Sequence, residues 1–156
     1  MISIIAVGQK QPEWVNQAFL DYAGRLSGDQ KILLKEIKAE PRTTGKTVAA
    51  MKSAEAQRII AASDRIEILV ALDERGKLFS TEEFADFIEG LRRESRDVAF
   101  LIGGPDGLDE QLKKKCQYVM SLSPMTLPHG LARVLLAEQL YRAWSLANHH
   151  PYHRAS

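Results

Sequence analysis

The chain has 156 residues, of which 45% are hydrophobic, so one domain of ordinary size can bury a core without disulfides or metal ions. Lys and Arg total 21 against 20 for Asp and Glu, so no strong positive field attracts a polyanion. This balance counts against an RNA substrate unless local basic patches supply the attraction. Cys116 is the single cysteine, which excludes an internal disulfide and a cysteine-based metal site.

The N-terminal residues do not follow the basic-then-apolar pattern of a secretory leader. Apolar runs in the sequence are also much shorter than a membrane-spanning helix requires. We therefore expect a soluble, cytoplasmic protein with no membrane partner. Cys116 follows three lysines in a helical stretch, and we expect a structural thiol there.

Strands and helices alternate in the first part of the chain. Residues 2–7 form a nearly continuous apolar run, which is typical of a strand covered on both faces, and a second strand is expected over 32–37. Apolar side chains at helical spacing predict a helix over 14–26 and, more weakly, another over 51–62. The polar segment 38–47 is typical of a mobile basic loop, either a solvated linker or a contact for phosphate groups.

The same alternation continues to the end of the chain, where the longest helix lies. Ser80 with Glu83 predicts a capping box before a third helix, whose apolar stripe covers 84–91. Pro128 suits the first turn of the last helix, which runs to about residue 147 and is apolar around most of its circumference. Such a helix needs two covering surfaces, and we expect the sheet and a second copy of the chain, hence a homodimer. The remaining expected elements are strands over 66–72, 98–102 and 118–122 and a short helix over 109–116.

These elements predict a single α/β domain, 1–156, with a mostly parallel sheet of five to six strands and helices on both faces. In such sheets ligands bind beyond the carboxyl ends of the strands. Leu72 and Asp73 follow one strand, and from the residues alone a plain turn explains them better than a ligand site does. Gly103 and Gly104 follow the next; a tight turn would explain them, but we favour a ligand site, since glycines let the backbone approach a ligand closely. Their spacing matches neither the dinucleotide fingerprint nor the phosphate-binding P-loop.

A third strand end carries the segment 122–129, in which two prolines restrict a loop before the last helix. Small hydroxyls and apolar side chains on a rigid loop suit a flat heteroaromatic ring. An ordinary strand-to-helix connector is the alternative. From the residues alone, the two interpretations are equally supported.

The C-terminal tail, 148–156, is rich in His, Tyr and Arg, and all four histidines lie between residue 129 and the C-terminus. Neither acidic nor thiol ligands accompany them, so we expect no metal site. Terminal residues are often disordered, but these side chains can stack on a base and hold an anion, and we favour a functional tail. Glu138 and Arg142 have the spacing of a helix pair. Arg133 and Arg142 lie on an apolar helix, where a buried guanidinium needs a partner anion.

Five segments together resemble the 23S ribosomal RNA pseudouridine N3-methyltransferases of the SPOUT superfamily. In chain order they are MISIIAVG, LIGGPDGL, SLSPMTLPH, EQLYRAW and HPYHR, and they span nearly the whole chain. The resemblance implies a C-terminal trefoil knot, a homodimer and S-adenosylmethionine as methyl donor. The implied target is a pseudouridine in the helix 69 stem-loop of 23S rRNA on assembled ribosomes. The implied cofactor-binding residues are Leu72, Gly103, Leu122, Ser123, Pro124, Met125, Thr126 and Leu127.

A mechanism for this reaction needs a route for the imino proton and a cation beside the flanking oxygens. We expect His153 or Tyr152 near the proton and Arg154 on the oxygens or on a phosphate. Further catalytic candidates are Glu138, Arg142 and His129. If a dimer places each tail over the partner's cofactor loop, the site is composite. The alternatives are an α/β enzyme acting on a phosphorylated metabolite and a non-enzymatic, ribosome-associated RNA-binding factor.

Overall fold

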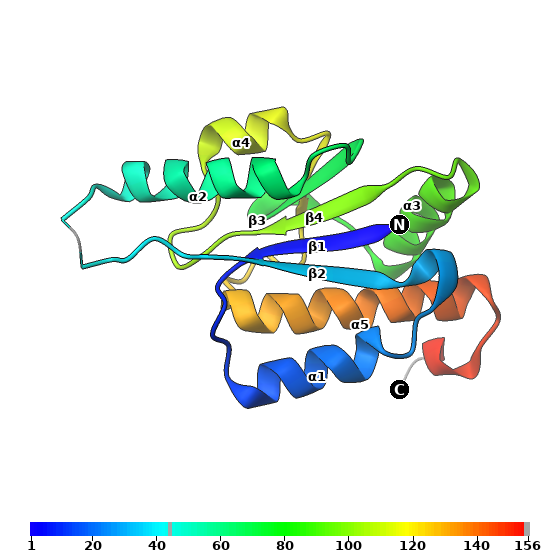
Figure 1. Cartoon of the computed structure of the whole chain (residues 1–156). Helices are drawn as coiled ribbons and strands as arrows, with labels where there is room; N and C mark the ends of the chain where they lie inside the picture. The colour runs from blue at the N-terminus through cyan, green and yellow to red at the C-terminus, as the bar shows by residue number, and fades with distance from the viewer. Residues whose placement is uncertain (44, 155–156) are drawn as a thin grey trace.

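The computed structural model describes residues 1–43 and 45–154; Thr44 of segment 38–47 and the last two tail residues lie outside this part. Five strands form one sheet in the order β2-β1-β4-β3-β5, and all neighbours run parallel (Figure 1). The strands are β1 (Ile2–Val7), β2 (Ile32–Ile37), β3 (Ile68–Leu78), β4 (Val98–Ile102) and β5 (Tyr118–Ser121). The helices are α1 (Glu13–Ala23), α2 (Val48–Ala62), α3 (Thr81–Arg93), α4 (Glu110–Lys115) and α5 (His129–Ala147), with short 3₁₀ turns η1 (Gly28–Gln30) and η2 (Pro151–His153).

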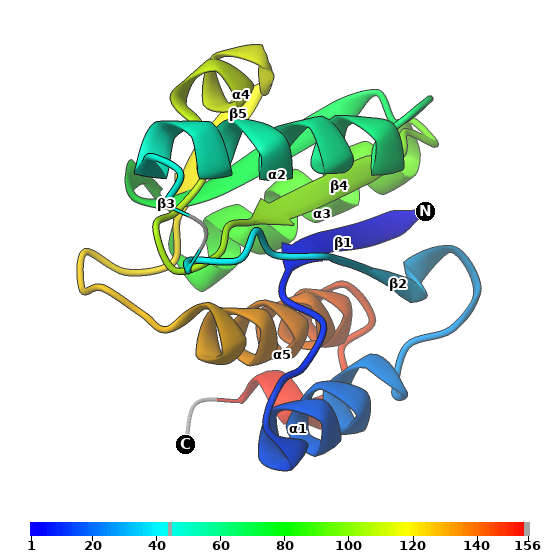
Figure 2. The same ribbon diagram turned by 60° about the vertical axis from the view of Figure 1, so that its left-hand side comes forward.

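Helices cover both faces of the sheet, as the sequence predicts. Helices α2 and α4 lie on one face, and α1, α3 and α5 lie on the other (Figure 2). Successive side chains of a strand point to opposite faces. Ile4 of β1 therefore joins the core beneath α5, whereas Ile5 joins the core beneath α2. This two-sided burial explains why β1 and β4 are apolar at nearly every position.

Helix α5 finds its covering surfaces within one chain. It packs against α1 and α3 on either side and against the sheet. Of its large apolar side chains, Leu135 is the exposed exception, at 37%. The apolar circumference of this helix therefore does not by itself require a second copy of the chain, and the homodimer stays a prediction. Pro128 is the N-cap with an extended backbone (ψ 141°), one residue before the first turn that we expected it to occupy.

Strand β3 begins later and ends later than the sequence predicts. It runs past Leu72 because both Leu72 and Lys77 pair with Met120 of β5, and residues 73–76 bulge out between these two pairings. Gly76 allows β3 to pair with β5 again after the bulge, because a Cβ at this position would lie only 2.7 Å from the carbonyl oxygen of Val119. The sequence predicted that the strand ends at Leu72, because the residues that follow are polar and pair with β5 through their backbone.

Two local predictions are confirmed. Ser80 Oγ accepts a hydrogen bond from the Glu83 amide at 3.1 Å, and the Glu83 carboxylate accepts one from the Ser80 amide at 2.9 Å, which completes the capping box of α3. Burial raises the pKa of the Cys116 thiol to about 11, as expected of a structural cysteine. Over residues 1–43 and 45–154, no helix combines the length and apolarity needed to span a bilayer.

Candidate functional site

The three strand ends selected from the sequence meet in one cavity of about 540 Å³. Residues 72–75, 102–108 and 122–129 contribute its walls, at the carboxyl ends of β3, β4 and β5. Every residue expected to hold a cofactor lines this cavity except Pro124, which is exposed on the turn after β5. Parallel strands bring these segments together because their carboxyl ends share one edge of the sheet.

The glycine turn, residues 103–107, forms the wall after β4. The Gly107 amide donates to the Gly104 carbonyl at 3.0 Å, and Gly107 has a φ of +82°. A Cβ at Gly103 would lie 2.5 Å from the carbonyl carbon of Gly107, so no larger residue fits without moving the backbone. The turn therefore presents backbone groups to the cavity at close range.

The bulge of β3 contributes another wall through residues 73–75, and Glu74 was not predicted from the sequence as a site residue. The carboxylate of Glu74 accepts a hydrogen bond from the Thr126 hydroxyl, which joins two walls of the cavity. Beside it, burial of Asp73 opposes ionisation, but hydrogen bonds from Lys113 (2.6 Å) and the Arg75 amide (2.9 Å) outweigh burial and hold its pKa well below the usual range. In the sequence, the polar residues 73–75 follow directly on the apolar part of β3, and this pattern could have indicated a site residue there.

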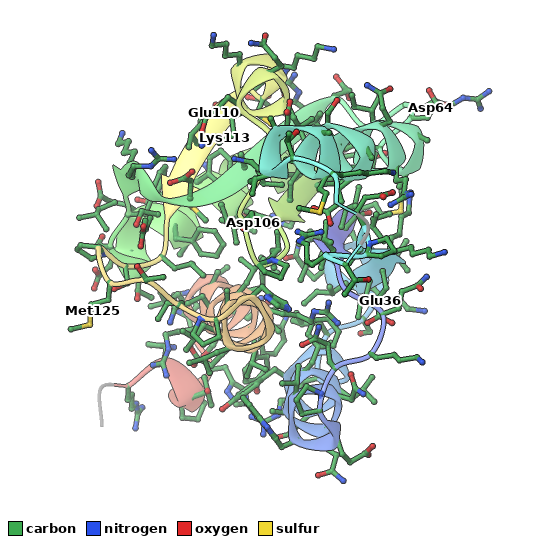
Figure 3. The ribbon with its side chains drawn as sticks, turned by 90° about the vertical axis from the view of Figure 1, so that its left-hand side faces the viewer. Glu36, Asp64, Asp106, Glu110, Lys113 and Met125 are labelled. Atoms are coloured by element: carbon green, nitrogen blue, oxygen red, sulfur yellow. The ribbon has the colours of Figure 1, made fainter. Side chains whose placement is uncertain are left out.

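The turn after β5 is held by side-chain hydroxyls rather than by regular structure. Ser121 Oγ donates to the Ser123 carbonyl at 2.8 Å, and Ser123 Oγ accepts from the Met125 amide at 3.0 Å. Met125 is 76% exposed and projects from the tip of this turn (Figure 3). The turn therefore has a defined shape and an apolar side chain at its mouth.

His129 and Arg133 lie in the first turns of α5, beside the cavity that His129 and Ala132 line. His129 lines the cavity, and its burial, together with the nearby charge of Arg133, lowers its pKa and favours a neutral imidazole. Arg133 is 1% exposed and donates to Glu36 at 2.7 Å and to the Gly8 carbonyl at 3.2 Å. The partner anion that this buried guanidinium requires is therefore Glu36, at the end of β2.

Four of the other five catalytic candidates form a separate group, which we call the tail cluster: Glu138, Arg142, Tyr152 and His153. The Tyr152 hydroxyl donates to Glu138 at 2.7 Å, and Arg142 donates to the same carboxylate at 2.8 Å. The His153 ring nitrogen Nδ1 lies 3.1 Å from Ser145 Oγ. In Figure 1 the tail lies beside α1, at the far end of α5 from the cavity.

His129 is thus the one catalytic candidate that lines the cavity of its own chain. Glu138 lies about 13 Å further along α5, at 1.5 Å per residue. Arg154 is exposed at the end of η2. Within one described chain the tail cluster and the cavity are therefore apart. Arg25, in the turn after α1, helps to hold the cluster, with its guanidinium 5.7 Å from the Tyr152 ring.

Comparisons with known proteins agree with this architecture. Residues 1–153 match the family model described as predicted SPOUT methyltransferase. The chain is 55% identical over 152 residues to the ribosomal RNA large subunit methyltransferase H of Bordetella avium, and the match covers 97% of each chain. It is 53% identical over 153 residues to the protein of that name from Methylibium petroleiphilum, with 98% of each chain covered.

Solved structures share the fold at low sequence identity. A probable methyltransferase from Bordetella pertussis superposes with a TM-score of 0.58 at 18% identity, covering 91% of this chain and 95% of that one. A probable methylase family protein from Haemophilus influenzae gives a TM-score of 0.62 at 14% identity, covering 99% of this chain and 70% of that one. The sequence matches cover nearly the whole chain, and the solved structures share its fold. The chain belongs to the SPOUT methyltransferases, in the ribosomal RNA large subunit methyltransferase H family.

Proposed function

We propose that this rRNA methyltransferase transfers a methyl group from S-adenosylmethionine to N3 of a pseudouridine in the helix 69 stem-loop of 23S rRNA. It acts on assembled ribosomes in the cytoplasm. The observation that carries the proposal is the meeting of three strand-end turns in a single cavity of about 540 Å³ in a chain of this family. Neither alternative, a metabolite enzyme or a non-enzymatic factor, has a comparable supporting observation.

The cavity has the chemistry that a sulfonium nucleoside requires. Leu72, Leu122 and Leu127 supply apolar surface for a flat adenine ring. The glycine turn and the turn after β5 supply backbone groups that can hydrogen-bond to its edge. Glu74 places a carboxylate at the rim, where a cofactor with a positive charge is favoured over an anion. In the same fold, a putative methyltransferase from Legionella pneumophila was solved with S-adenosylmethionine bound.

The tail cluster supports a composite active site in a homodimer. Its residues lie away from the cavity of their own chain, so a catalytic role requires the cavity of a partner. The trefoil knot implied by the family likewise stays a prediction. In the composite arrangement each tail covers the partner's cofactor loop, and an isolated protomer is inactive.

The tail residues differ in what they can contribute to the removal of the imino proton. Burial of Tyr152 and its hydrogen bond to Glu138 raise the pKa of the phenol, so Tyr152 stays protonated and donates. His153 is the better candidate for the base, since Ser145 fixes the orientation of its ring. Arg154 is exposed and can hold an oxygen of the target base or a phosphate.

The decisive experiment is mass mapping of methylated nucleotides. Pure protein is incubated with labelled S-adenosylmethionine and either unmethylated ribosomes or protein-free 23S rRNA. We expect one added methyl group on N3 of a helix 69 pseudouridine, and only with ribosomes. Methylation at another nucleotide, or none with ribosomes that are confirmed to be unmodified, would overturn the proposed target.

A further inference from the structure

The β2–α2 segment, residues 38–47, is basic in sequence, yet two of its three cations, Arg42 and Lys46, pair with carboxylates of the protein, while Lys38 is exposed. Lys46 Nζ lies 3.0 Å from a carboxylate oxygen of Glu40, and Arg58 of α2 binds the other oxygen of that group. Arg42 donates to Glu55 of α2 at 2.8 Å. Glu40 is 6% exposed and Glu55 is 2% exposed, so both carboxylates need these cations. The pairing of Arg42 and Lys46 argues against a phosphate contact through these two cations.

Arg42 also reaches the back of the glycine turn. Its Nε donates to Asp106 Oδ2 at 3.0 Å, and its Nη1 donates to the Glu40 carbonyl at 2.7 Å. A Cβ at Gly104 would lie 3.6 Å from both Arg42 Nη2 and Glu55 Oε1, so the turn packs directly on this ion pair. Asp106 lies in the turn below α2 (Figure 3), and the other face of the turn lines the cavity.

From this geometry we propose that Arg42 is a positioning residue for the cofactor site, an inference that rests on the proposed binding of S-adenosylmethionine in the cavity. Its guanidinium joins the β2–α2 segment and α2 to the glycine turn, which is far from both in sequence. A guanidinium is planar and has donors in fixed directions, so it can bind Glu55 and Asp106 at once. An ammonium group on a flexible stem cannot hold the same two partners in this geometry.

The physical consequence is a turn that is ordered before the cofactor binds. Ordering a loop during binding costs affinity, and a turn already braced from behind avoids that cost. Loss of the Arg42 contacts should therefore weaken cofactor binding roughly tenfold, the scale of one charge-assisted hydrogen bond. The kcat at saturating cofactor should change by less than about twofold, because Arg42 touches no reacting group.

Three variants test this role: Arg42→Lys, Asp106→Asn and, as a matched control, Arg58→Lys. The control alters a cation that anchors the same segment through Glu40 but does not contact the glycine turn. Hydrogen exchange of the unliganded proteins is measured at the amides of residues 103–108, with the Gly107 amide as reporter. Calorimetry with S-adenosylhomocysteine and the KM and kcat of methyl transfer are measured on the same samples.

We expect faster exchange in the glycine turn and roughly tenfold weaker binding for Arg42→Lys and Asp106→Asn, with Arg58→Lys like the unaltered protein. The double variant should be little worse than either single one, because both remove the same contact. Unchanged exchange at 103–108 in Arg42→Lys, or an equal change in Arg58→Lys, would overturn the proposal. If the unaltered protein binds no nucleoside cofactor, the proposed function fails, while the exchange comparison still decides the role of Arg42.

Discussion

The hydroxyl of Tyr152 donates a hydrogen bond of 2.7 Å to Glu138 and so fixes the C-terminal tail to the middle of α5. Arg142 binds the same carboxylate, and its guanidinium lies 4.9 Å from the Tyr152 ring. One carboxylate thus links the tail to a helix whose first turn lies at the cavity. The tail therefore packs against α5. Mutations in the tail can test its contribution to activity without changing the cavity.

Replacing Tyr152 with Phe keeps the ring against Arg142 and removes only the hydroxyl. We expect the unfolding free energy to fall by about 1 kcal/mol, the net value of one hydrogen bond. Hydrogen exchange should become faster in residues 149–154, and methyl transfer should slow while cofactor affinity is retained. Tyr118→Phe, at an exposed tyrosine of β5, is the control. Equal effects of the two substitutions would show that the Glu138 contact does not hold the tail.

Truncation after Asn148 should leave cofactor binding nearly intact and abolish methyl transfer. The reason is that the described residues among those removed, 149–154, do not line the cavity of their own chain. Isothermal calorimetry and transfer assays on one sample measure both properties. A truncated protein with full activity would remove the tail from the mechanism.

Mixing the truncated chain with a Gly103→Val chain tests whether the tail acts on a partner. The first has a cavity without a tail, and the second has a tail with a blocked cavity. A mixed dimer contains one complete composite site, so activity should return although each parent is inactive. If each tail serves its own cavity, the mixture stays inactive.

Gly103→Val should by itself prevent cofactor binding, because a Cβ there would lie 2.5 Å from the backbone of Gly107. Reshaping the turn also destroys the backbone surface of the cavity. Gly90→Ala in α3 is the control, since a Cβ there meets open space and a helical alanine gains roughly 0.5–1 kcal/mol of stability. Calorimetry and thermal unfolding distinguish loss of the site from loss of the fold. Normal binding by Gly103→Val would place the cofactor elsewhere.

Asp73 should give the protein an acid-sensitive contribution to stability. Burial opposes its ionisation, but Lys113 and Arg75 lower its pKa below the ordinary value of 3.8. A carboxyl whose pKa is depressed on folding stabilises the folded state above the unfolded pKa, and this contribution is lost as the pH falls towards the folded pKa. Asp73→Asn should therefore be less stable at neutral pH and decline less steeply below about pH 5.

Urea unfolding at a series of pH values measures this difference. Asp64→Asn is the control, at an exposed carboxylate beyond the end of α2 (Figure 3). Its profile should follow that of the unaltered protein. Parallel profiles for Asp73→Asn and the unaltered protein would show that the contact with Lys113 does not contribute to acid stability.

Local features of the structure follow closely from the sequence. Strands β1, β2 and β4 have the predicted ends. The capping box of α3 is a contact between residues three apart, so a short motif predicts it. The glycine and proline turns were selected as ligand sites because every parallel sheet brings strand ends to one edge.

Contacts between residues that are far apart in sequence could not be predicted from such local patterns. Segment 38–47 was expected to be a solvated or phosphate-binding loop, yet Arg42 pairs with Glu55 and Asp106. The bulge at Glu74 depends on how β5 pairs with two separate parts of β3. Charge pairing and strand register are decided by which segments become neighbours in space, and a residue pattern does not contain that information.

By itself, the sequence determined the α/β class, most element boundaries and the family, because burial periodicity and short motifs are local properties. The tertiary structure alone decided that α1 and α3 cover α5, that the three turns share one cavity, and that the tail cluster lies apart from it. The physical reason is that a side chain's environment depends on chain segments that meet only when the whole core is packed.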